Sequence, residues 1–187
     1  MDHDSLEGDP FQNSPFRGRV VPFARRWHVI QEIDLIRLVG GQRGRLALCE
    51  LAEHIADDLP QQREPETTTF LAALDGLVMR GGADEDACLA AMLLGGPDDP
   101  LAQTLLDHIR TRHVAEVAAA RELIAALTEA DAAPSPETLG HMLRGFFTAC
   151  RHAVDFEQLT IIALAGHRLT PDARAVLADA LAESAAA

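Results

Sequence analysis

Histidine residues recur along this chain at positions that could bind a metal ion. His28, His54, His113 and His152 each fall in a different segment of helical periodicity. Side chains from facing helices of a bundle converge on one point, and bundle cores are where proteins build sites of histidine and carboxylate ligands. A single histidine is more often a surface or a satisfied core residue. The metal hypothesis therefore depends on which histidines and carboxylates the helices bring together.

Four long helices are expected to position these residues. Apolar residues at three- and four-residue steps predict the first helix over 27–39, and Gly40 and Gly41 end it. The second is expected from about 44 to 77 with an interruption at Pro65, because a proline ring removes an amide donor and clashes with the preceding turn.

Capping signals mark the third and fourth helices. Asp99 precedes Pro100, and Ser135 precedes Pro136, which are the residue types preferred at the N-cap and first helical positions. These helices are predicted to run to about 127 and 169. Shorter helices are expected at 84–94, capped by Asp84, and after Pro171.

The expected fold is all-α, an up-down-up-down four-helix bundle with short accessory helices. Each apolar stripe needs a partner, and short connections make neighbouring helices antiparallel. A flexible tail is expected at 1–22, where Gly and Pro occur among polar residues, and the bundle at 23–183. The length of 187 residues suits one domain with a full-sized core.

Composition supports a helical protein and argues against several partners. The chain has no Tyr and no Lys and is rich in Ala and Leu, which favours helix over sheet. Its formal net charge of -13 repels phosphate backbones and anionic lipid head groups, so neither nucleic acid nor a membrane surface is an expected partner.

The cysteines and the apolar runs indicate a cytoplasmic location. Cys49, Cys88 and Cys150 are odd in number and widely spaced, which is typical of reduced thiols. No apolar run approaches the roughly 20 residues that span a bilayer, and the N-terminus is acidic where a signal peptide is basic.

Three segments resemble the hemerythrin-like (HHE cation-binding) family. They look like the second, third and fourth helices of its bacterial members, and their sequences are ELAEHIADDLPQQREPETTTFLAAL, LLDHIRTRHVAEVAAARELIAAL and ACRHAVDFEQLTIIALAGHRLT. The resemblance covers about residues 23 to 180. It implies a hemerythrin-like bundle that holds non-haem iron between its helices and uses it to sense or handle oxygen, nitric oxide or redox state.

The resemblance also implies metal ligands. His28 matches the first-helix histidine of the family, Glu66 the second-helix carboxylate, His113 the third-helix histidine and Glu157 the fourth-helix carboxylate. Two imidazoles and two carboxylates suit iron, manganese or zinc.

Two family histidines are replaced. Gln62 stands at the second-helix histidine position, and Ala153 stands at the fourth-helix position. His152 is one residue away, which rotates it by about 100° around the helix, and an alternative register would pair His152 with Glu157. The site is expected to be a mononuclear or incomplete di-iron centre, or to have been lost. Without a cation, Glu66 and Glu157 would need protonation, a hydrogen bond from Gln62 or exposure to solvent.

Two functions follow as hypotheses. In the first, a residual iron centre binds a small diatomic ligand or changes redox state, and the helix packing responds. In the second, the bundle is metal-free and serves as an interaction or regulatory module for a protein partner. A third, enzymatic hypothesis, such as a small oxidase or a di-iron repair protein, would need a redox-competent centre with an open coordination site. We rank it last and do not expect an enzyme, because the sequence offers no evidence of a substrate pocket and contains neither a phosphate-binding glycine loop nor a nucleophile elbow.

Overall fold

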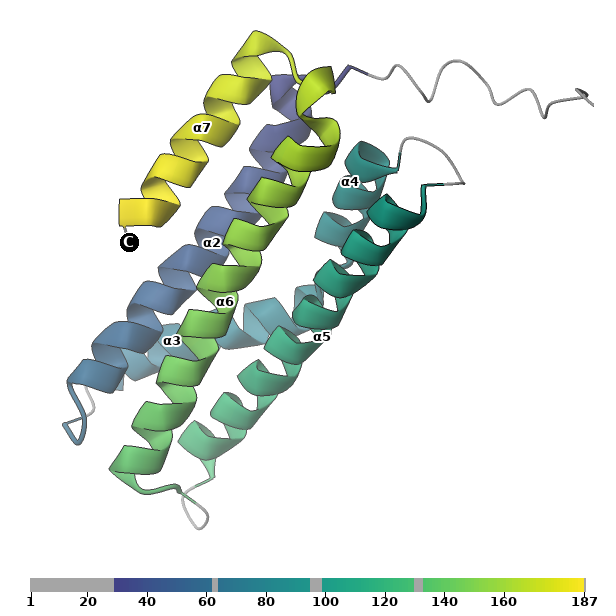
Figure 1. Cartoon of the computed structure of the whole chain (residues 1–187). Helices are drawn as coiled ribbons and strands as arrows, with labels where there is room; N and C mark the ends of the chain where they lie inside the picture. Colours follow the sequence, from purple (N-terminus) through teal and green to yellow (C-terminus); the bar gives the residue numbers. More distant parts are fainter. Residues whose placement is uncertain (1–28, 62–63, 95–98, 130–132, 187) are drawn as a thin grey trace, which may run out of the picture.

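The computed structural model describes residues 29–61, 64–94, 99–129 and 133–186, and this part of the chain is helical (Figure 1). Its one β feature is an isolated parallel bridge between Ile30 and Leu169. The elements are α2 (Glu32–Asp57), α3 (Glu64–Arg80), α4 (Ala83–Leu93), α5 (Pro100–Thr128), α6 (Pro136–Ala165), the 3-10 turn η2 (Gly166–Arg168) and α7 (Pro171–Ala186). The predicted tail at 1–22 lies outside the described residues.

Helix α6 is central to the arrangement. It packs against α2 on one side and α5 on the other, and its direction is opposite to both (Figure 1). Helix α3 contacts α2 and α5, while α4 contacts α2, α5 and α6. Helix α7 lies along the outer side of α2. The long helices α2 and α5 and the short α4 therefore all pack against α6.

The predicted break between the first and second helices is wrong. Helix α2 continues from Glu32 to Asp57 through Gly40, Gly41 and Gly44. Glycine inside a helix costs about 0.5–1 kcal/mol relative to alanine, which is why the sequence suggested an end there. The apolar residues before and after the glycines lie on one buried stripe of α2, and packing of that stripe outweighs the weak local preference.

The predicted interruption at Pro65 has a different position. Helix α2 ends at Asp57 and α3 begins at Glu64, so Pro65 lies in the first turn of α3. A first-turn proline loses no intrahelical hydrogen bond, because the amides there have no helical acceptor. Proline starts this helix and does not kink it.

Two of the predicted caps are confirmed. The side chain of Asp99 accepts a hydrogen bond from the backbone amide of Ala102 at 3.0 Å, and Ser135 accepts one from Thr138 at 3.3 Å. Helix α6 ends at Ala165, four residues before the predicted end, and the chain continues into a 3-10 turn.

The predicted cap at Asp84 is wrong. The N-cap of α4 is Gly82, whose φ of 75° lies in the left-handed region that favours glycine, and Asp84 belongs to the first turn. A side chain at Gly82 would also press against the ring of His113.

A polar layer divides the core into two apolar clusters. One cluster lies towards the α3 end of the molecule and includes Cys49, Phe70 and Leu143. The other lies beneath α4 and α7 and includes Leu38 and Ile161. Between them are the buried polar residues of α2, α5 and α6, which are Gln42, Arg45, His113, Glu116, Glu157, Gln158 and Thr160.

None of the described helices is long and apolar enough to cross a membrane. The three cysteines are free thiols, as predicted; Cys49 and Cys150 are buried.

Truncation of a core leucine should destabilise the protein strongly. Leu74 on α3 is fully buried, whereas Met79 on the same helix is 85% exposed. We expect Leu74→Ala to lower the free energy of unfolding by about 2–5 kcal/mol, because a cavity replaces packed side-chain atoms. Met79→Ala is the control, with an expected change of about 0.5 kcal/mol or less. Urea unfolding followed by circular dichroism measures both, and equal losses would contradict the packing described here.

Candidate metal centre

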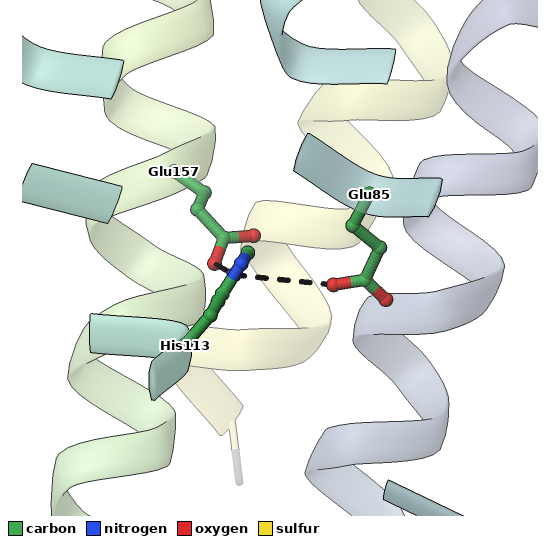
Figure 2. Close-up of side chains that lie close together, drawn as sticks. All are labelled: Glu85, His113 and Glu157. Carbon is green, nitrogen blue, oxygen red and sulfur yellow. Dashed lines mark hydrogen bonds and ion pairs between the residues drawn. The ribbon is translucent and has the colours of Figure 1, made fainter. Parts of the chain in front are cut away.

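Three side chains in the polar layer converge as a possible metal-ligand group. Glu85 of α4, His113 of α5 and Glu157 of α6 each offer one ligand atom, and these atoms lie within 4.8 Å of one another. Figure 2 shows the three side chains pointing towards a common point. Glu157 and His113 are 1% and 4% exposed, and the Glu85 side chain is partly exposed. The group is thus closed on the α6 side and open on the α4 side.

His113 lies between two carboxylates. Its Nδ1 is 2.7 Å from Asp86 Oδ1, and its Nε2 is 2.9 Å from Glu157 Oε1. An ionised carboxylate only accepts hydrogen bonds, so both ring nitrogens must donate, which describes an imidazolium. Burial is the largest influence and lowers the pKa of His113, but the hydrogen bond to Glu157 and the carboxylate charges outweigh it and raise the pKa above its ordinary value.

Glu157 receives donors on both oxygens. Its Oε1 faces His113, and its Oε2 accepts from Arg45 Nη2 at 2.6 Å and from Gln42 Nε2 at 2.9 Å. Burial alone would raise the pKa of Glu157, but the hydrogen bond from His113 and the charge of Arg45 together lower it. Glu157 is therefore a buried carboxylate that stays ionised.

Arg45 is the cation of the polar layer. Besides Glu157, its guanidinium lies 3.3 Å from Glu116 Oε2 and 3.4 Å from Glu85 Oε2. Burial favours its neutral form, but these three carboxylates outweigh burial and raise the pKa of Arg45. The arginine and the imidazolium supply two positive charges against up to four carboxylates, Glu85, Asp86, Glu116 and Glu157.

Glu116 is the least satisfied carboxylate of the layer. Its Oε1 is buried without a hydrogen-bond partner among the described residues. Burial raises the pKa of Glu116, since desolvation outweighs the attraction of Arg45 and His113.

Gly41 lets the Glu85 carboxylate approach helix α2 closely. A methyl group at Gly41 would overlap the Glu85 carboxylate, whereas one at Gly40 or Gly44 would meet open space. That open space belongs to a cavity of about 500 Å³ beside the cluster. Its lining includes Arg45, Glu85 and His113 of the cluster, together with Arg37, Arg80 and Val117.

The ligands implied by the family resemblance are only partly brought together. His113 and Glu157 meet directly. Glu66 is half-buried in the first turn of α3 and His152 is exposed on α6; neither belongs to the ligand group around His113. Ala153 faces the core, with 1% of its surface exposed. His28 and Gln62 lie outside the described residues.

Several residues of the cluster were not predicted from the sequence, and only some of them had a signal in their spacing. Gln42 and Arg45 occupy positions on the buried stripe of α2 between Leu38 and Leu48, which becomes visible only if the helix continues through its glycines. Glu116 follows His113 by three residues on the same face of α5. Glu85 and Asp86 belong to the acidic first turn of α4, and nothing in their spacing predicts that they face the core.

Comparisons with known proteins identify no relative. No family model matches the chain, and no match is found among curated proteins or solved structures.

The ion pairs of His113 should make the metal-free protein less stable as the pH rises. Because the folded-state pKa is raised, their contribution is complete below about pH 6.5, the unfolded value, and is lost as the pH passes the folded value. We expect the difference in unfolding free energy between the unmodified chain and His113→Gln to shrink between pH 6 and 9. Urea unfolding in EDTA measures this difference; a constant difference would show that folding does not raise the pKa of His113.

Proposed function

We propose that this protein binds one divalent transition-metal ion through Glu85, His113 and Glu157. The convergence of these three ligand atoms within 4.8 Å carries the proposal. Bonds to imidazole nitrogen and carboxylate oxygen are about 2.0–2.2 Å long, so two ligands of one ion lie roughly 3.0–3.5 Å apart. His113 Nε2 is 2.9 Å from Glu157 Oε1 and 4.0 Å from Glu85 Oε2. A small shift of the partly exposed Glu85 would complete the geometry.

Asp86 supports His113 as a ligand. Metal-binding histidines usually donate their other ring N–H to a carboxylate, which fixes the tautomer and raises the basicity of the ligating nitrogen. The contact of 2.7 Å from His113 Nδ1 to Asp86 provides this arrangement and directs Nε2 towards Glu85 and Glu157.

The charges around His113 also favour a cation. With His113 protonated, two positive charges, on Arg45 and His113, face up to four carboxylates: Glu85, Asp86, Glu116 and Glu157. If a divalent ion replaced the Nε2 proton, His113 would become neutral. The ion and Arg45 together would then place three positive charges against the same carboxylates. Metal binding then releases a proton, so affinity rises with pH.

The ligand set leaves room for a small exogenous ligand. One imidazole and two carboxylates fill part of the coordination sphere of iron, manganese or zinc, and Glu85 and His113 line the cavity of about 500 Å³. Ferrous iron would supply reversible binding of dioxygen or nitric oxide, the role that the hemerythrin-like resemblance implies. We therefore propose an iron-dependent responder, in which ligand entry from the cavity alters the contacts that Glu85 and His113 make between α4, α5 and α6.

Metal binding should require His113. The unmodified chain, stripped with chelator, is expected to bind one Zn²⁺ by calorimetry, and His113→Ala to bind at least about 100-fold more weakly, because a first ligand is lost. His108→Ala, on the exposed face of the same helix, is the control and should bind as the unmodified chain does. Circular dichroism confirms that each variant folds. No binding by the unmodified chain would overturn the proposal.

Substitution of two nearby aspartates tests whether the contact from Asp86 supports His113 as a ligand. Asp86→Asn should weaken Zn²⁺ binding about 10–100-fold, the usual effect of losing a carboxylate behind a ligating histidine. Asp84→Asn removes the same charge two residues away, where the aspartate pairs with exposed Arg37, and should change the affinity little. Equal effects of the two variants would mean that overall charge, and not Asp86, supports the site.

The proposed responder role has a separate test. The chain loaded anaerobically with Fe²⁺ should develop a new visible absorption on addition of nitric oxide, and His113→Ala treated in the same way should not. An unchanged spectrum in an iron-loaded sample would reject a diatomic-ligand function and leave metal binding intact.

One observation favours a metal-free module as a second candidate. Arg45 already places a positive charge against Glu85, Glu116 and Glu157, so the layer does not depend on a metal ion for charge compensation. The bundle would then act as a scaffold whose acidic surface, at a formal net charge of -13, meets a protein partner. The absence of Zn²⁺ binding in the first experiment would favour this function.

A further inference from the structure

Arg45 has an unusual position for an arginine side chain. It is 4% exposed, lies in the middle of the core, and contacts carboxylates from three helices. The guanidinium nitrogens lie 2.6 Å from Glu157 Oε2, 3.3 Å from Glu116 Oε2 and 3.4 Å from Glu85 Oε2. A cation surrounded by three carboxylate oxygens from α4, α5 and α6 has the ligand environment of a bound metal ion, with a guanidinium at its centre.

Two of these carboxylates face two cationic positions at once. Glu157 directs Oε1 to His113 and Oε2 to Arg45. Glu85 Oε2 lies 4.0 Å from His113 Nε2 and 3.4 Å from Arg45 Nη2. Carboxylates shared in this way bridge the ions of two-metal sites, which lie about 3.5–4 Å apart. The geometry therefore contains two cation positions, one beside His113 and one at the Arg45 guanidinium.

The guanidinium fits the second position incompletely. Arg45 Nε and Glu116 Oε1 are buried without hydrogen-bond partners among the described residues. The five N–H donors of a guanidinium lie in one plane and point in fixed directions, whereas an ion is coordinated by oxygens from any side. A planar donor group among carboxylates from three helices leaves Glu116 Oε1 without a donor in the described part of the chain.

We infer that the Arg45 guanidinium is a tethered cation in the place of a second metal ion, so that it restricts this site to a single metal. The inference in its full form rests on the proposed metal site beside His113. An arginine stays charged at any physiological pH and cannot dissociate, so the second position is permanently filled. Arg45 lines the cavity of about 500 Å³, and a shorter side chain would connect this position to the cavity and admit an ion.

Metal stoichiometry tests the inference. Full-length Arg45→Ser, saturated with Zn²⁺ and desalted, should contain one more zinc per chain than the unmodified protein by elemental analysis. Arg45→Lys keeps a tethered cation and should show no gain. Arg110→Ser, at an exposed arginine paired with Asp107, controls for the loss of a positive charge and should also show no gain.

Glu116 identifies where the additional ion binds. Glu116 contacts Arg45 but is not part of the ligand group around His113. The double variant Arg45→Ser/Glu116→Gln should therefore lose the additional zinc and keep the zinc content of the unmodified chain. Retention of the additional zinc would move it away from the Arg45 position and overturn the inference.

Thermal unfolding tests the inference even if Arg45→Ser folds poorly without metal. At a Zn²⁺ concentration about a hundredfold above Kd, we expect the Tm of Arg45→Ser to rise by about 5–10 °C more than that of the unmodified chain. If the variant is unfolded in EDTA, Zn²⁺ should restore its helical circular dichroism. Failure of Zn²⁺ to stabilise or refold it would overturn the inference.

The outcomes separate this inference from the proposed function. No zinc in the unmodified chain and one in Arg45→Ser would reject the metal-binding function and support Arg45 as a metal substitute. One zinc in both would support the function and overturn the inference.

Discussion

The buried carboxylate of Glu157 is the constraint on which the middle of this molecule depends. At 1% exposure it cannot be solvated by water, and an uncompensated charge in such a place is prohibitively costly. His113, Arg45 and Gln42 supply its donors from α5 and α2. Loss of one partner from a buried pair typically costs about 3–5 kcal/mol, because the other charge remains. These helices are consequently held in one relative register by polar contacts as well as by apolar packing.

The polar layer also explains the shape of the core. On α2 the buried stripe passes from Leu35 and Leu38 through Gln42 and Arg45 to Leu48, and α5 and α6 show the same order of apolar, polar and apolar positions. Sliding any of these helices by one turn would place a charge against hydrocarbon. A polar layer of this kind selects one arrangement at some expense of stability, whereas either apolar cluster alone would tolerate several.

Three kinds of cation compete for the same carboxylates in the proposed chemistry. A proton occupies Nε2 of His113, a guanidinium is attached to α2 through Arg45, and a metal ion would replace the proton. The proton and the metal exchange with solvent through the cavity, but the guanidinium does not. In this proposal, the carboxylates of Glu85, Asp86, Glu116 and Glu157 set how many positive charges the layer accepts, and the fixed charge of Arg45 limits how many of them are exchangeable ions.

The family resemblance named His113 and Glu157 as candidates, but tertiary structure decided that they meet. The sequence by itself determined the helical fold class and the capped starts of α5 and α6. These features depend on local spacing, which a sequence displays directly. Only tertiary structure decided that α2 continues through three glycines, because the energy that holds it together comes from packing against α6. Tertiary structure alone also revealed Arg45, Glu85 and Asp86 as parts of the site. Charged residues on a helix usually face water, and their burial here depends on which helices lie against one another.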